Sequence, residues 1–150
     1  MTPGTDAPPG PVVLDTNVVS ELMRAAPDAR VADWVLEVPP TTVFTTSVTL
    51  AELLFGIARL PAGRRRKLLT DAADNVFETF ADRILSFDTV AARQYAAIVT
   101  EREHAGTPIA GFDAQIAAIC RCNGALLATR NTDDFSGLEL DLINPWLTDA

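Results

Sequence analysis

The chain has 150 residues, enough for one domain with a substantial core, and its 48% apolar and 21% charged composition excludes general disorder. Its net charge of −8 excludes binding of a polyanion through an overall basic field, so any nucleic-acid contact must use a local basic patch or bound cations. No apolar run reaches the roughly 18 residues of a membrane-spanning helix, so we expect no membrane association.

The composition of the N-terminal stretch predicts where the domain begins, and the cysteines indicate the cellular compartment. Residues 1–10 contain three prolines and two glycines and lack the basic and apolar segments of a signal peptide. We therefore expect a disordered leader at 1–10 and a single domain over 11–147. Cys120 and Cys122 have no further cysteines or clustered histidines around them, so we expect reduced packing residues of a cytoplasmic protein.

The rest of the chain alternates between short β-branched runs and amphipathic stretches. In chain order we predict a strand at 12–14, helices at 18–25 and 29–37, a strand at 43–46, helices that begin at Ser47 and Arg64, a strand at 84–87, a helix ending near His104, a helix at 109–122, and strands at 125–129 and 140–143. This alternation predicts the α/β class, with a mostly parallel sheet of four or five strands and helices on both faces.

Asp15 follows the first predicted strand directly. The carboxyl end of a buried strand is where open α/β sheets place their ligands, so Asp15 is a candidate site residue. Thr16 and Asn17, which come next, favour turns and helix starts, so Asp15 could equally serve only as the cap of the following helix. The local sequence leaves both readings open.

Further acids fall near the same edge of the predicted sheet. Glu52 lies one turn into a helix among apolar residues, although rotation of that helix could simply expose it. Asp113 lies near a helix start, where the helix dipole alone would favour a carboxylate. The segment 131–134 follows a strand. Carboxylates that converge at one edge need a cation, and oxygen ligands without matching His or Cys suit Mg²⁺ or Mn²⁺. The pattern indicates metal-dependent phosphodiester hydrolysis.

The concentrated basic run comprises Arg64, Arg65, Arg66 and Lys67. Such a run is usually a solvated helix face. On an acidic protein it is also the best candidate for contact with a phosphate backbone.

Five motifs together resemble a known family. They are LDTNVVSEL at 14–22, SVTLAELLFGI at 47–57, FDAQIAAI at 112–119, ATRNTDDF at 128–135 and NPW at 144–146. Their order and separations resemble PIN-domain ribonucleases of the VapC and FitB type from toxin–antitoxin operons. The resemblance implies a three-layer α/β/α sandwich, an Mg²⁺ or Mn²⁺ site, endoribonuclease activity, a cognate antitoxin, and a homodimer.

The resemblance also implies roles for individual residues. The catalytic, metal-holding acids of the family fall on Asp15, Glu52 and Asp113. The family's fourth position, often Asp, is occupied here by Asn131, which departs from the pattern. Supporting roles fall on Thr16, Asn17 and Asp134, with Asp134 expected to help hold its loop. We expect RNA contacts from Arg24, Arg64, Arg65, Arg66 and Lys67.

Other functions fit the residues less well. A phosphatase with a nucleophilic Asp needs a second acid two residues on, where this chain has Asn17. A receiver module needs a lysine near its last strand, and Lys67 lies elsewhere. The alternative that remains is a degenerate PIN-fold module that binds RNA or a partner protein without cleavage.

Overall fold

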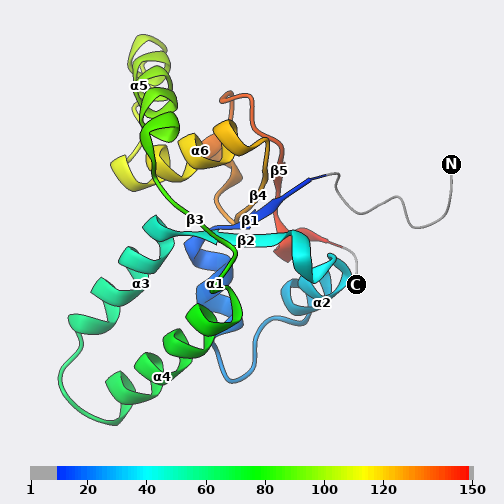
Figure 1. The fold of residues 1–150 in the computed structure, drawn as a ribbon, viewed down its shortest axis with the longest axis vertical. Helices are drawn as coiled ribbons and strands as arrows, with labels where there is room; N and C mark the ends of the chain where they lie inside the picture. The colour runs from blue at the N-terminus through cyan, green and yellow to red at the C-terminus, as the bar shows by residue number, and fades with distance from the viewer. Residues whose placement is uncertain (1–9, 149–150) are drawn as a thin grey trace, which may run out of the picture.

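Five short strands form one parallel sheet in the order β3-β2-β1-β4-β5 (Figure 1). The strands are β1 Val12–Leu14, β2 Val43–Thr46, β3 Ile84–Leu85, β4 Leu126–Ala128 and β5 Leu142–Ile143. The structure is a computed structural model that describes residues 10–148, so the predicted disordered leader lies outside the described residues except for Gly10. The prediction of a parallel sheet of four or five strands is confirmed.

Within the described residues, six α-helices connect and cover the strands. They are α1 Thr16–Leu22, α2 Ala29–Glu37, α3 Ser47–Ala58, α4 Arg64–Thr79, α5 Thr89–His104 and α6 Gly111–Asn123. Short 3-10 turns occupy Pro40–Thr42, Thr132–Phe135 and Pro145–Leu147. Helices α5 and α6 cover one face of the sheet, whereas α1 and α2 lie on the other, and α3 and α4 form a hairpin that projects away from it (Figure 1).

The central strand β1 supplies both layers of the core. Val12, Val13 and Leu14 are fully buried. Because side chains alternate along a strand, Val13 packs into the cluster built by α5 and α6, and Val12 and Leu14 pack into the cluster on the α1 face. A strand that is covered on both faces requires an uninterrupted apolar run of this kind. Helices therefore pack on each face of the sheet, and the fold is a three-layer α/β/α sandwich.

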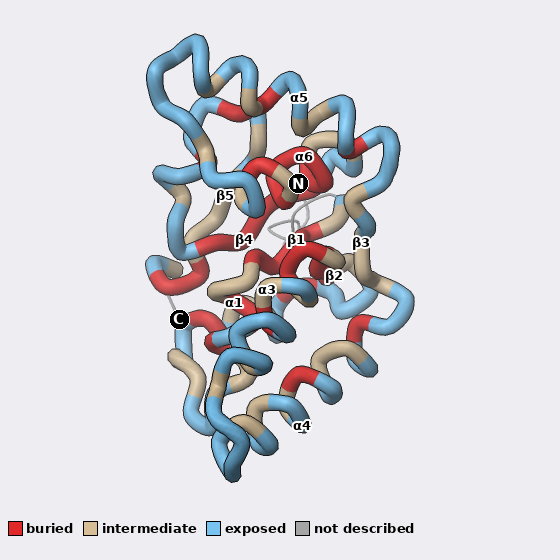
Figure 2. The backbone as a smooth tube through the Cα atoms, turned by 90° about the vertical axis from the view of Figure 1, so that its left-hand side faces the viewer, coloured by how far each residue is buried: buried red, intermediate tan, exposed pale blue. Residues whose placement is uncertain are grey.

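Burial is concentrated in the middle of the molecule. Figure 2 shows buried backbone through β1, β4 and α6, and exposed backbone along much of α4 and α5. Helix α6 ends at Asn123 because Gly124 follows in the left-handed region, at φ 60°. Both cysteines are free thiols, and Cys120 is fully buried. Of the helices in the described part of the chain, none is long and apolar enough to cross a membrane.

Several element boundaries differ from the prediction. The first helix begins at Thr16 because Asp15 is its N-cap, and it ends at Leu22 because the Glu21 carboxylate accepts the Asp28 backbone N–H (2.9 Å) and turns the chain. The strand predicted at 84–87 covers only two residues, since the Phe87 N–H lies 3.4 Å from the Ser47 hydroxyl instead of joining the ladder.

The later boundaries also shift. The helix predicted from 109 begins at Gly111, with Ala110 as its N-cap. The strands predicted at 125–129 and 140–143 are shortened to 126–128 and 142–143. The Thr129 N–H still donates to the Ile143 carbonyl (2.9 Å), so the backbone pairing continues one residue beyond the strand.

Candidate active site

Asp15 lies at the point where the order of the strands reverses, between the carboxyl ends of β1 and β4. Its side chain is 5% exposed, and each carboxylate oxygen has a donor. Oδ1 accepts the Thr16 backbone N–H (2.8 Å), and Oδ2 accepts the Thr129 hydroxyl (2.8 Å). Asp15 is therefore both the cap of α1 and a carboxylate fixed at the crevice where α/β sheets bind ligands.

Burial dominates the ionisation of Asp15. It raises the pKa of this carboxyl above its usual value, the hydrogen bonds from Thr129 and Thr16 lower the pKa, and the charge of Asp134 raises it. The ionised form is thus costly in this position unless a positive charge lies beside it.

Glu52 faces the same region from α3. Its Oε1 accepts a hydrogen bond from the Thr16 hydroxyl at 2.7 Å, and that hydroxyl also lies 3.1 Å from the Thr49 hydroxyl. Thr16 therefore contacts two acids at once, Asp15 through its backbone and Glu52 through its side chain. Helix rotation leaves Glu52 half-buried and turned toward α1.

Asp113 lies in the first turn of α6 and is half-buried. Burial raises its pKa to about 6, with further contributions from the charges of Asp15, Asp134 and Glu52. A carboxylate that served only the helix dipole would have a lowered pKa. The raised pKa of Asp113 instead reflects its burial first and, after that, the charges of Asp15, Asp134 and Glu52 from other elements.

Thr129 is a site residue that the sequence analysis did not identify. It is fully buried, and its hydroxyl oxygen lies within reach of three groups. It donates to Asp15 and accepts from the Asn17 side-chain amide (3.4 Å) and the Asn131 backbone N–H (3.1 Å). Asn17 also accepts the Arg130 backbone N–H (3.2 Å), so Asn17 supports Asp15 only through Thr129. The available signal was the position of Thr129 at the end of the strand next to β1.

The segment after β4 brings further polar groups to the site. Asn131 has its backbone held at both sides, because its N–H bonds Thr129 and its carbonyl accepts the Asp134 N–H (3.0 Å). The Asn131 and Asp134 side chains are exposed. Asp133 and Asp134 line a cavity of about 210 Å³ together with Asp113.

The oxygen donors of the site are of the type that binds a hard divalent cation, although they lie too far apart in this structure to bind one as a group. Asp15, Glu52 and Asp113 offer carboxylate oxygens, and Asn131 offers an amide oxygen, the ligand types of Mg²⁺ and Mn²⁺. Between residues 10 and 148, however, no group of three His, Cys, Asp or Glu side chains stands close enough to hold a metal as placed. Burial and the charges of the neighbouring acids disfavour the ionised form of Asp113, and a bound cation would offset both effects.

The basic residues differ in their relation to the acids. Arg65 lines a groove of about 350 Å³ together with Thr16, Ser20 and Glu52. Arg64 and Lys67 are exposed nearby at the start of α4, and Arg66 is half-buried. Arg24 follows α1, and its guanidinium pairs with the Glu21 carboxylate at 3.2 Å.

The chain is similar to known proteins over nearly its whole length. Residues 12–139 match the PIN domain family. The chain is 40% identical over 136 residues to the VapC ribonuclease Y4jK of Sinorhizobium fredii, covering 90% of this chain and 97% of that protein. It is 35% identical over 136 residues to toxin FitB of Neisseria gonorrhoeae, covering 90% and 98%. The crystal structure of FitAcB from Neisseria gonorrhoeae matches with a TM-score of 0.84 and 35% identity, covering 91% of this chain and 99% of that chain.

Proposed function

The chain belongs to the PIN-domain family and, within it, to the VapC and FitB type of toxin, and from this we propose that it is the endoribonuclease of a toxin–antitoxin pair. The proposed reaction is hydrolysis of an RNA phosphodiester bond. The observation that carries the proposal is the placement of Asp15, Glu52 and Asp113 at the carboxyl edge of the sheet. Thr16 donates hydrogen bonds to both Asp15 and Glu52, and the charges of these two acids add to the effect of burial on the pKa of Asp113.

We propose that Asp15, Glu52 and Asp113 hold Mg²⁺ or Mn²⁺, with Asn131 as a weaker fourth group. When bound, such an ion would lower the pKa of an attacking water and offset negative charge at phosphorus. The chain's own residues orient the ligands. Thr16 fixes Glu52 against α1, and Thr129 fixes Asp15 against β4. One of the three carboxylates would also accept the proton that the water releases.

Charge supports an RNA path along the α3–α4 hairpin. The protein is acidic overall, so the phosphate backbone must approach through a local cationic surface. Arg65 is the basic residue of the run that shares a groove with Glu52. We therefore assign the principal phosphate contact to Arg65, with Arg64, Arg66, Lys67 and Arg24 supplying weaker attraction around it.

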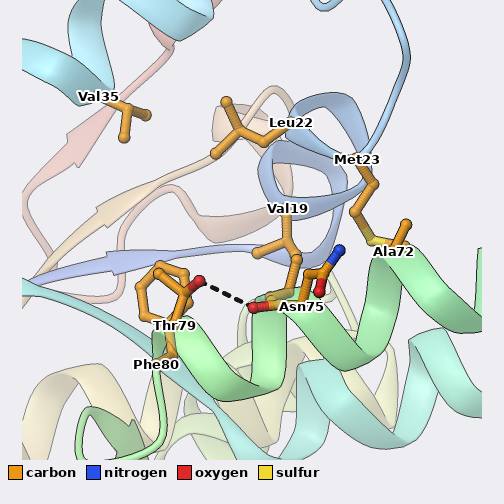
Figure 3. A pocket seen from close by; sticks show the side chains of 9 residues that line it. Val19, Leu22, Met23, Val35, Ala72, Asn75, Thr79 and Phe80 are labelled. Atoms are coloured by element: carbon orange, nitrogen blue, oxygen red, sulfur yellow. Dashed lines mark hydrogen bonds between the residues drawn. The ribbon is translucent and has the colours of Figure 1, made fainter.

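A second groove supports docking of a protein partner. It encloses about 440 Å³ between α1, α2 and α4, and apolar side chains including Val19, Leu22, Met23 and Val35 line it (Figure 3). Structures related to this chain include toxin–antitoxin complexes of the FitAB and VapBC kind. We propose that the cognate antitoxin lays an apolar helix face into this groove, since apolar grooves between helices accept such faces.

We also propose a homodimer that acts in the cytoplasm, where its RNA substrate would be found. Leu54 and Phe55 are 48% and 63% exposed next to each other on α3, which favours burial against a second copy. Light scattering of the antitoxin-free protein after size exclusion would measure the mass in solution directly.

Cleavage of total RNA by the purified, antitoxin-free protein tests the function. Wild type, Asp15→Asn and Asp33→Asn would be compared with and without Mg²⁺ or Mn²⁺, since Asp33 is an exposed aspartate of α2. We expect discrete metal-dependent fragments from wild type and Asp33→Asn, and a loss of about a hundredfold or more in Asp15→Asn. Equal cleavage by Asp15→Asn would contradict the role of Asp15.

The same experiment addresses the alternative of a degenerate module. That protein would bind RNA or the antitoxin in a gel-shift assay and leave RNA intact with either metal. The intact set of Asp15, Glu52 and Asp113 favours cleavage, whereas Asn131 in the fourth position is the residue that favours the alternative.

A further inference from the structure

Arg102 lies in the last turn of α5, and its guanidinium binds main-chain carbonyls of two separate segments. Nη2 donates to the carbonyl oxygens of Asp134 (2.6 Å) and Ser136 (3.0 Å). Nη1 donates to the carbonyl of Thr107 (3.3 Å), in the turn that leads to α6. Among the ion pairs of residues 10–148, none involves Arg102. The side chain is therefore committed to fixing backbone and is not neutralised by an acid.

Arg102 binds the segment 131–136, which follows β4 and carries the polar groups Asn131, Asp133 and Asp134. At its start, the Thr129 hydroxyl accepts the Asn131 N–H. In its middle, Phe135 is 1% exposed and anchors the 3-10 turn in the core. At its end, Arg102 binds the carbonyls on both sides of Phe135. With both ends and the middle fixed, the backbone of Asp134 has a defined place relative to α6.

The fixed segment faces the acid of α6. Arg102, Asp113, Asp133 and Asp134 line the same cavity of about 210 Å³. The Asp133 and Asp134 side chains remain exposed, because Arg102 takes the carbonyl of Asp134 and leaves its carboxylate free. Arg102 thus binds the main chain of Asp134 and not its carboxylate.

We propose that Arg102 is a positioning residue of the cation site. It holds Asp134 beside Asp113 by fixing the carbonyls of Asp134 and Ser136 to the end of α5. The inference deepens the proposed metal-dependent function and rests on it. The planar fork of an arginine suits this task, since one guanidinium can donate to several carbonyls in a set geometry. A lysine, with a single ammonium centre, keeps the charge and loses the fork.

A role of Arg102 through its charge and a role through positioning predict opposite changes in metal affinity. A variant that keeps the charge and loses the carbonyl contacts distinguishes the two roles. Removing a cation near an acidic site would by charge alone tighten metal binding. Arg102→Lys keeps the charge and removes the three-carbonyl geometry, so a change in this variant reports positioning. Arg121→Lys is the matched control, because Arg121 also donates to a carbonyl of the following segment, that of Leu138 (3.4 Å), and is mostly buried.

The experiment is titration of the antitoxin-free protein with Mn²⁺, with free Mn²⁺ followed by electron paramagnetic resonance well below each variant's unfolding temperature. We expect Arg102→Lys to bind Mn²⁺ about tenfold more weakly than wild type. Arg121→Lys should stay within about twofold, as expected for a residue outside the ligand support. Thermal melts of both variants verify that the folded protein is being titrated.

The possible outcomes distinguish a failure of the Arg102 role from a failure of the proposed ribonuclease function. Wild-type affinity in Arg102→Lys overturns the positioning role and leaves the ribonuclease proposal standing. An equal loss in Arg121→Lys also overturns it, because the effect would then be a general loosening of the segment. If the wild-type protein bound no Mn²⁺, the metal-dependent function itself would fail, and the inference with it.

Discussion

The hydroxyl of Thr129 donates a 2.8 Å hydrogen bond to Oδ2 of Asp15 and joins the ends of two neighbouring strands across 114 residues of sequence. Asp15 is almost fully buried, so this bond is one of the two that offset the cost of its charge. The geometry of the candidate site therefore depends on a residue that is neither acidic nor basic.

Thr129→Val should destabilise the fold by about 1–3 kcal/mol, because an isosteric side chain removes the donor to Asp15 and the acceptor for Asn17 and Asn131. Urea unfolding at neutral pH measures the free energy of unfolding. Thr129→Ser keeps the hydroxyl and should lose clearly less. A Thr129→Val variant as stable as wild type would show that the hydrogen bonds of this hydroxyl do not stabilise the fold.

Thr16→Val tests the link between α1 and α3. The variant removes the hydroxyl that donates to Glu52 at 2.7 Å and retains the backbone N–H that binds Asp15. Glu52 would then sample other rotamers, and we expect RNA cleavage about tenfold slower in kcat, as for other residues that orient ligands. Single-turnover cleavage at saturating Mg²⁺ provides the measurement. Thr16→Ser should retain most of the activity, and a wild-type rate in Thr16→Val would remove Thr16 from the site.

The first strand shows how far the sequence determines the fold. Val12 to Leu14 predicts a buried central strand because an apolar run covered on both faces has few other uses. The carboxyl ends of parallel strands share one edge, so the positions of Asp15, Glu52 and Asp113 could be placed together without coordinates. The comparisons confirm the resemblance to PIN-domain toxins that the five motifs indicated.

The supporting residues could not be predicted in the same way. Thr129 acts through a partner on another strand, and Arg102 acts on backbone carbonyls, which leave no mark in a residue pattern. The two-residue strands β3 and β5 were predicted too long because apolar Phe87 lies two residues after β3 and apolar Leu140 lies two residues before β5, and neither belongs to the strand. Propensity identifies such runs, while tertiary pairing decides where the strand ends.

Arg65 is expected to bind RNA phosphate more strongly than its neighbours, because it shares the groove of Glu52. In an Asp15→Asn background, which we expect to prevent cleavage, Arg65→Gln should weaken binding of a labelled single-stranded RNA. The slope of log affinity against log salt should fall by about 0.7, the loss of one phosphate contact. Fluorescence anisotropy at several salt concentrations measures both values. Arg64→Gln is the control, and an equal loss in that variant would indicate diffuse attraction along α4.

Asp113 should make the metal-free protein less stable as pH rises. Its pKa is raised from 3.8 to about 6 in the folded state, by burial first and then by the other acids. The folded state therefore holds a proton that the unfolded chain has released between these values. This favourable contribution is complete below pH 3.8 and is lost as pH rises through about 6.

Asp113→Asn should consequently stabilise the metal-free protein at pH 7, where wild type carries the repelled charge, and should have little effect near pH 3.5. Because the side chain is half exposed, solvent screening limits the gain to about 1 kcal/mol. Urea unfolding in EDTA at the two pH values measures it. Adding Mn²⁺ should reverse the order at pH 7, since wild type would gain stability from binding and the variant would gain less. A variant that is less stable than wild type in EDTA at pH 7 would show that Asp113 is held by favourable contacts and not crowded by other acids.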